Sequence, residues 1–170
     1  MKDEKNYNGL LMKIGAETEN KIMDWLKINN REILDFREFR LAQRIDVDFG
    51  IETMDGSILL AEVKSDKWIN ENGNFLFEWN RINHYVENKW FYLGWGWRSP
   101  AQYLIVRNPE SCETFIFNFV HLRKFVALYV NKMGKNLKFS IIETDKQKTT
   151  FCILIPMKEL SHLYKKFIIK

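Results

Sequence analysis

A short Asp55-Gly56 turn between two segments of alternating residues constrains the fold of this chain more than any other feature. Residues 43–53 and residues 57–65 both show the period-two pattern of polar and apolar side chains that is typical of β-strands. Asp-Gly is among the most frequent dipeptides in the tight turns of hairpins. The sequence therefore predicts an antiparallel hairpin. A three-residue loop, residues 54–56, joins its strands, with Gly56 in the left-handed conformation.

The length of this loop decides which side chains of the hairpin meet. A two-residue turn would pair Phe49 with Glu62 and leave Asp48 on the other face. The three-residue loop instead places Asp48 directly opposite Glu62. It also places Asp46 opposite Lys64, which shares a face with Glu62 because side chains alternate along a strand. We therefore expect carboxylates and an ammonium group within one cross-strand neighbourhood.

The paired carboxylates of this neighbourhood predict a bound cation. The Cβ atoms of directly opposed residues lie about 5 Å apart, and carboxylates that close repel one another unless a cation lies between them. Hard divalent cations with oxygen ligands suit such a site. Glu62-Val63-Lys64 alone is also ordinary strand surface, so a structural salt bridge is the alternative. Apolar residues 58–61 favour a central strand, where charges are costly unless they are used or paired.

The rest of the sequence predicts a mixed fold. Its 170 residues suit a single domain, residues 1–170. Residues 66–97 are the least regular part of the pattern. Helices are expected at residues 10–28, 120–133 and 157–167, and further strands at residues 34–40, 101–107, 113–119, 139–143 and 150–155. This order indicates an α/β fold of the mixed α+β kind, with a central mixed β-sheet flanked by helices.

Composition limits the classes of function. The chain has 26 basic and 22 acidic residues, a net charge of +4 that suits a polyanionic partner without requiring one. Cys112 and Cys152 are far apart and indicate a reducing compartment, and the three histidines are too scattered for a zinc site. The polar start and the lack of a long apolar run predict a cytoplasmic protein without a membrane partner.

The arrangement of Asp48, Glu62 and Lys64 resembles the PD-(D/E)XK nuclease superfamily, whose core motif is Asp…Glu-x-Lys. Small phage-type members often continue as residues 64–68 do here, Lys-Ser-Asp-Lys-Trp, and then as residues 73–78 do, Gly-Asn-Phe-Leu-Phe-Glu. The resemblance implies a restriction-endonuclease-like core. It also implies an endonuclease that hydrolyses phosphodiester bonds with Mg²⁺ or Mn²⁺ as cofactor, most often in DNA.

A second motif of that superfamily lies in the first predicted helix. Gly15-Ala-Glu-Thr-Glu19 matches the Gly-x-x-x-Glu pattern, in which the glycine would allow the helix to approach the sheet. Glu19 lies at the edge of the apolar stripe and is preferred over Glu17, which projects toward solvent. The proline that precedes the first aspartate in the family is replaced by Val47 here. This change removes no chemical group.

The resemblance implies a role for each site residue. Asp48 and Glu62 would hold the metal ion, with the carbonyl group of Val63 as a neutral third ligand. Asp46 is an alternative to Asp48, since both are expected on one face. Glu19 would be an outer ligand or a ligand of a second metal ion. Lys64 would orient the attacking water and balance charge.

Arg81, Arg98 and Trp97 are candidate substrate-binding residues, because arginines contact phosphates and tryptophans stack on bases. Glu78 and Arg81 are expected on one face of a helix, as an ion pair or as a substrate contact. The expected partners are nucleic acid, with DNA favoured, and a second copy of the chain. An RNA endonuclease, and a non-catalytic nucleic-acid-binding or assembly protein on a nuclease scaffold, are the alternatives.

Overall fold

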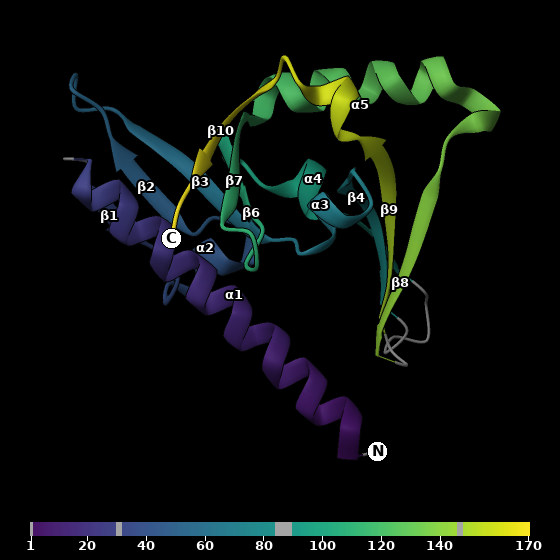
Figure 1. Ribbon diagram of the computed structural model, residues 1–170, viewed down its shortest axis with the longest axis horizontal. Coiled ribbons are helices and arrows are strands. Elements are labelled where there is room, and N and C mark those ends of the chain that lie inside the picture. Colours follow the sequence, from purple (N-terminus) through teal and green to yellow (C-terminus); the bar gives the residue numbers. More distant parts are fainter. Residues whose placement is uncertain (1, 30–31, 84–89, 146–147) are drawn as a thin grey trace.

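The computed structural model describes residues 2–29, 32–83, 90–145 and 148–170 as two β-sheets with helices packed around them (Figure 1). The first sheet has the order β1-β2-β3-β6-β7-β10, and the second has the order β5-β4-β9-β8. The strands of the first sheet are β1 (Ile33–Asp35), β2 (Phe49–Glu52), β3 (Ile58–Ser65), β6 (Tyr103–Arg107), β7 (Glu113–Asn118) and β10 (Tyr164–Ile168). Those of the second are β4 (Asn74–Asn83), β5 (Trp90–Leu93), β8 (Phe139–Asp145) and β9 (Lys148–Pro156).

The helices are α1 (Lys2–Ile28), α2 (Arg40–Arg44), α3 (Trp68–Glu71), α4 (Trp95–Arg98) and α5 (Phe119–Met133), with short 3₁₀ turns η1 (Gly134–Asn136) and η2 (Met157–Leu160). In the first sheet β3 and β6 are parallel, whereas the other neighbours are antiparallel. The predicted class, a mixed α+β fold with a central mixed sheet flanked by helices, is therefore confirmed. None of the helices in the described residues is long and apolar enough to cross a membrane.

Two apolar cores lie on opposite faces of the first sheet. Helix α1 buries Ile22 and Leu26, which are spaced one helical turn apart, against Phe49, Ala61 and Val63. The larger core lies between the two sheets and α5. It combines large side chains from β4, β6, β7, β9 and α5, including Phe75, Phe77, Leu104, Phe117, Leu122, Val126, Ile153 and Ile155.

The predicted hairpin register is confirmed. Phe49 pairs with Ala61 and Glu52 pairs with Ile58. The N–H group of Thr53 donates to the carbonyl of Ser57 at 2.9 Å, which leaves a loop of three residues. Gly56 is left-handed, with φ of 80°, as the three-residue loop requires.

The chain before β2 differs from the prediction, because residues 34–40 and 43–53 are not two long strands. Strand β1 ends at Asp35, and residues 40–44 form the helix α2. This short helix lets the chain reverse between two antiparallel neighbours. The N–H group of Phe36 donates to the carbonyl of Asp48 at 2.9 Å and closes the connection.

The predicted helix at residues 157–167 is also wrong. Met157–Leu160 forms one 3₁₀ turn, and the chain then continues as β10, antiparallel to β7. The ring of Tyr164 packs edge-on against Phe115 and Phe117, which holds this segment extended. Tertiary contacts therefore override the helical pattern of the sequence.

Other predicted elements agree with the structure. Helix α5 covers the segment where a helix was expected, residues 120–133. Asn118 caps its N-terminus, because the side-chain oxygen accepts a hydrogen bond from the N–H group of His121. The strands β6, β7, β8 and β9 lie where they were expected. Residues 146–147, which connect β8 to β9, lie outside the described residues.

Candidate active site

Asp48 lies just before β2 and remains beside β3. Its N–H group donates to the carbonyl of Ala61 at 3.0 Å. Its carboxylate oxygen Oδ2 accepts the N–H of Val63 at 2.7 Å. Burial raises the pKa of Asp48 above its usual range, although Lys64 and the Val63 N–H oppose this effect. The carboxylate is therefore oriented by the backbone of the strand that carries Glu62.

Glu62 is the most buried charged residue of the site, at 1% exposure. Its oxygen Oε1 accepts a hydrogen bond from the ammonium group of Lys64. Among the described residues, Oε2 has no hydrogen-bond partner. Burial raises the pKa of Glu62 to about 8; Lys64 counteracts this rise, and the nearby charge of Asp48 adds to it. A second positive group beside this carboxyl would therefore be stabilising.

Lys64 is fixed between a carboxylate and an aromatic ring. Burial lowers the pKa of its ammonium group, but the carboxylates of Glu62 and Asp48 together outweigh that effect and raise it. Its Nζ atom also lies 5.6 Å from the ring centre of Trp95. The side chain is still 33% exposed. Lys64 is therefore a charged donor that solvent or a ligand can reach.

Helix α1 contributes Glu19 near this group. Burial raises the pKa of Glu19, and the charge of Asp48 raises it further, while Arg37 and Lys64 lower it. Arg37 Nη1 lies 3.8 Å from a Glu19 carboxylate oxygen. Glu17 is exposed. The structure therefore places Glu19, of the two glutamates, within the electrostatic reach of Asp48.

Gly15 does not have the role that the sequence predicted. A Cβ atom at Gly15 would meet nothing within 4 Å, so this glycine does not allow a close approach of α1 to the sheet. The approach is made one turn later and beyond, where Thr18 and Ile22 are buried. The expectation of a packing glycine is therefore wrong.

Asp46 does not lie opposite Lys64, as the hairpin pattern predicted. It adopts a left-handed backbone conformation, with φ of 55°, in the turn after α2. Its carboxylate accepts a hydrogen bond from Arg98 Nε at 2.7 Å. Its backbone carbonyl accepts a hydrogen bond from the hydroxyl of Ser99 at 2.6 Å. Arg98 of α4 and Ser99 therefore hold Asp46 in place. Asp46 is two positions before Asp48 in the sequence.

The α4 segment connects both sides of the site. Trp95 contacts the ammonium group of Lys64, and Arg98 pairs with Asp46. Arg123 of α5 donates to the carbonyl of Gly96 at 2.7 Å and also to that of Ser99. The segment is thus anchored to the core by a third element. No local pattern in the sequence connects residues 46 and 98, so these supporting contacts could not be predicted from it.

The candidate substrate residues are largely engaged within the protein. Arg81 Nη2 lies 3.0 Å from Glu78 Oε2, and Arg98 binds Asp46. The ring of Trp97 packs edge-on against Phe77 and Trp79, with its centre 5.3 Å and 5.2 Å from theirs. Their proposed contacts with substrate stay predictions.

Glu78 and Arg81 lie on a strand, not on the predicted helix. Strand β4 has an irregularity between Glu78 and Asn80, so that Trp79 is an extra residue relative to β9. In a regular strand, residues three apart face opposite sides. The bulge brings Glu78 and Arg81 to the same side and permits their ion pair.

The described part of the chain contains no group of three His, Cys, Asp or Glu side chains placed to hold a metal ion together. Asp48 and Glu62 form a two-carboxylate set, while Glu19 lies toward Arg37. Oε2 of buried Glu62 has no hydrogen-bond partner among the described residues, and the pKa values of Asp48 and Glu62 are raised. Both observations fit a cation bound by these two carboxylates.

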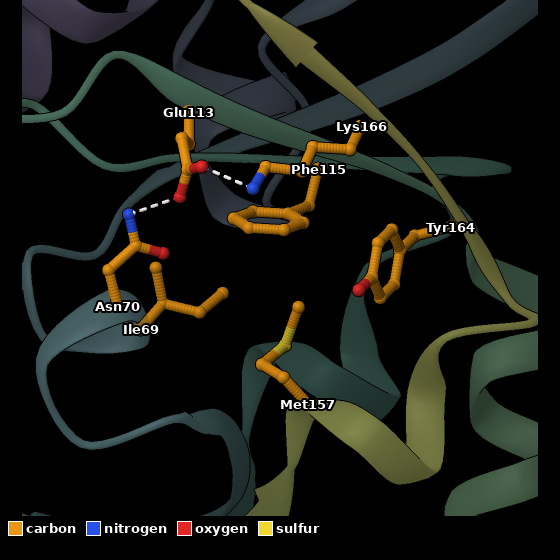
Figure 2. Close-up of a pocket in the computed structure, with 7 residues that line it drawn as sticks. All are labelled: Ile69, Asn70, Glu113, Phe115, Met157, Tyr164 and Lys166. Carbon is orange, nitrogen blue, oxygen red and sulfur yellow. Dashed lines mark hydrogen bonds and ion pairs between the residues drawn. The ribbon is translucent and has the colours of Figure 1, made fainter.

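A separate pocket of about 320 Å³ lies away from these residues (Figure 2). The lining residues come from α3, β7, η2 and β10: Ile69, Asn70, Glu113, Phe115, Met157, Tyr164 and Lys166. Glu113 accepts a hydrogen bond from Asn70 and forms an ion pair with Lys166 at the rim of the pocket. None of the predicted site residues lines it.

Comparison with known proteins adds one structural likeness. No protein-family model and no curated protein matches the sequence. Among solved structures, a bacterial homing endonuclease, I-Ssp6803I, is similar to 65% of this chain and 70% of its own, with 15% sequence identity and a TM-score of 0.48. A likeness of this size does not define a family.

Proposed function

We propose that this protein is a divalent-metal-dependent endonuclease that hydrolyses phosphodiester bonds in DNA. The observation that carries the proposal is the buried carboxylate of Glu62, which contacts Lys64, lies near Asp48 and keeps one oxygen without a partner among the described residues. Burial of unpaired acidic oxygens is costly. A bound cation that takes part in the reaction would offset this free-energy cost.

Asp48 and Glu62 would hold Mg²⁺ or Mn²⁺, whose preferred ligands are carboxylate oxygens. Glu19 would be an outer ligand, and the carbonyl of Val63 is a further candidate ligand. When bound, the ion would promote ionisation of an attacking water and neutralise charge on the phosphate. The N–H of Val63 keeps the Asp48 carboxylate oriented for this role.

Lys64 would act on the phosphate side of the site. Its raised pKa keeps the ammonium group charged, so it would donate hydrogen bonds rather than accept a proton. It would orient the attacking water and stabilise negative charge that develops on the phosphate oxygens. The ring of Trp95 and the carboxylate of Glu62 limit the positions that this ammonium group occupies.

Two arginines that the sequence analysis overlooked are better placed for phosphate contacts than Arg81 or Arg98. Arg40 and Arg44 begin and end α2, directly before the Asp48 segment. Both are exposed, and neither forms an ion pair with any residue that the structure describes. Exposed, unpaired cations beside a cleavage site suit the phosphate backbone. Arg107 is not a further candidate for such a contact, because it is 4% exposed and donates a hydrogen bond to the carbonyl of Ile169.

The function is tested by cleavage assays on linear, circular, single-stranded and branched DNA and on RNA, each with Mg²⁺, Mn²⁺ or EDTA. We expect cleavage of at least one DNA substrate with metal and none with EDTA. Cleavage of RNA alone would identify the RNA endonuclease instead. Binding to DNA without cleavage under any condition would favour the non-catalytic alternative, and neither binding nor cleavage would contradict the proposal.

Loss of the Asp46–Arg98 ion pair should slow cleavage without changing how DNA affinity depends on salt. Arg98→Ala frees the turn that positions Asp48, and small displacements of catalytic groups cost up to about a hundredfold in rate. A lost phosphate contact would instead reduce the salt slope by about one unit. DNA affinity is measured in Ca²⁺ at several salt concentrations, alongside the cleavage rate with Mg²⁺.

Asp46→Asn is the matched variant, since asparagine also tolerates the left-handed conformation of this position. Its rate should fall as much as that of Arg98→Ala, and the double variant should be no slower than either single variant. A salt slope that changes in Arg98→Ala alone would return Arg98 to the role of a phosphate contact.

A further inference from the structure

The outer edge of β8 is apolar and exposed. Strand β8 pairs with β9 on one side, and no described strand lies along its other side. The carbonyl of Lys138 accepts the N–H of Leu154 at 3.0 Å, so the residues that bond to β9 are the even-numbered ones. The backbone groups of Phe139 and Ile141 therefore point toward the free edge. Their side chains are 53% and 61% exposed.

These two side chains continue the core face of the second sheet. Phe139 lies opposite Ile153, and Ile153 lies opposite Phe77. Directly opposed residues share a face of a sheet, and both Ile153 and Phe77 are fully buried in the core. The apolar face of the sheet thus extends onto β8, where the described residues do not cover it.

Other sheet edges in the molecule carry features that prevent strand pairing. Strand β1 has three residues, and β5 has four. Strand β10 presents Lys165 and Lys166 in succession. Short length and lysines are common protections of edge strands. Residues 139–142 of β8 have neither charge nor proline, so this edge is open to pairing.

We propose that β8 pairs antiparallel with β8 of a second copy of the chain and joins the two four-stranded sheets. With Ser140 of each copy at the two-fold axis, Phe139 lies opposite Ile141 of the second copy. The outward backbone groups of these residues then exchange hydrogen bonds. Aromatic and β-branched residues form favourable cross-strand pairs, and each pair continues the buried apolar face.

The distribution of charge selects a second copy in this orientation. Lys138 directly precedes residues 139–142, and Glu143 directly follows them. Antiparallel pairing brings the Lys138 end of one strand toward the Glu143 end of the other, whereas parallel pairing would bring like charges together. The strand is therefore complementary to itself. This inference does not depend on the proposed nuclease activity.

Sedimentation equilibrium of the full chain tests the pairing, over about 1 to 200 µM because short interfaces associate weakly. We expect a reversible dimer. Ile141→Lys should weaken it at least about tenfold, because lysine disfavours an edge-to-edge contact. Leu128→Lys is the control: Leu128 is also exposed, but on α5, and this variant should dimerise like the unaltered chain. A monomer throughout, or a dimer unaffected by Ile141→Lys, would overturn the proposal.

A cross-linking experiment tests the register even if Ile141→Lys folds poorly. Cys112 and Cys152 are first replaced by alanine, because Cys152 lies directly opposite Ser140 on β9 and would compete by forming a disulfide within the chain. In this background Ser140→Cys should form an intermolecular disulfide on mild oxidation, because non-hydrogen-bonded partners bring the two Cα atoms to about 4.5 Å. Lys138→Cys should cross-link poorly, since its counterpart in the second copy would be Ile142. Equal yields from both variants, or none from Ser140→Cys, would contradict β8 pairing centred on Ser140.

Discussion

Glu62→Gln is expected to abolish metal-dependent cleavage while leaving the fold intact. The glutamine has the shape of the buried side chain but lacks its charge, so one of the two carboxylates that would share the cation is lost. We expect the cleavage rate to fall at least about a thousandfold, the upper scale for loss of one electrostatic group in an active site. Cleavage with Mg²⁺ and calorimetric titration with Mn²⁺ measure the two effects.

Glu17→Gln is the matched control, since Glu17 is an exposed glutamate of α1. It should bind Mn²⁺ and cleave DNA like the unaltered protein. Asp48→Asn should behave like Glu62→Gln, because both acids would hold the same ion. Mn²⁺ binding that persists unchanged in both site variants would show that the ion, if one is used, binds elsewhere.

Lys64→Met should retain Mn²⁺ binding and lose about a hundredfold in cleavage rate, the usual scale for one positioned catalytic group. Methionine keeps part of the apolar stem of Lys64 but removes the ammonium group, which lies over the ring of Trp95. The metal ion would still neutralise Glu62 and Asp48, so the site should stay assembled. Single-turnover cleavage at saturating Mg²⁺ separates this effect from weakened metal binding.

Lys67→Met is the matched control. Lys67 is three positions after Lys64 in the sequence, and its Nζ also lies over a tryptophan ring, 4.3 Å from the ring centre of Trp68. That variant should cleave at the unaltered rate. Full activity of Lys64→Met would instead reduce Glu62-Val63-Lys64 to a structural ion pair. A loss of both metal binding and activity would assign Lys64 to assembly of the site.

Local signals predicted the β2–β3 hairpin, β6, β7 and α5 well. The turn at Asp55-Gly56 and the alternating pattern established the hairpin register, because a one-residue shift would exchange buried and exposed faces. The same register predicted that Asp48 would lie beside the strand of Glu62 and Lys64. The structure also places Val63 on the opposite face, in the core against α1.

Features that depend on distant contacts could not be predicted from these patterns. Strand β10 is extended because β7 pairs with it, although the sequence predicted a helix at residues 157–167. The bulge at Trp79 is defined by its register with β9. The pairing of Asp46 with Arg98 joins residues 52 positions apart, and no local motif indicates it.

The contact between α4 and β4 has a consequence for finding distant relatives of this chain. Gly94 and Gly96 lie so close to the backbone of Glu78 that a Cβ atom at either position would collide with its carbonyl group. Glu78 also accepts the N–H of Trp95. Aromatic residues in this segment could exchange with other aromatic ones, whereas the two glycines have no substitute. A buried glutamate on one strand, with a Gly-x-Gly pair at the end of the next strand, would therefore be a more durable signature than the tryptophans that dominate the segment.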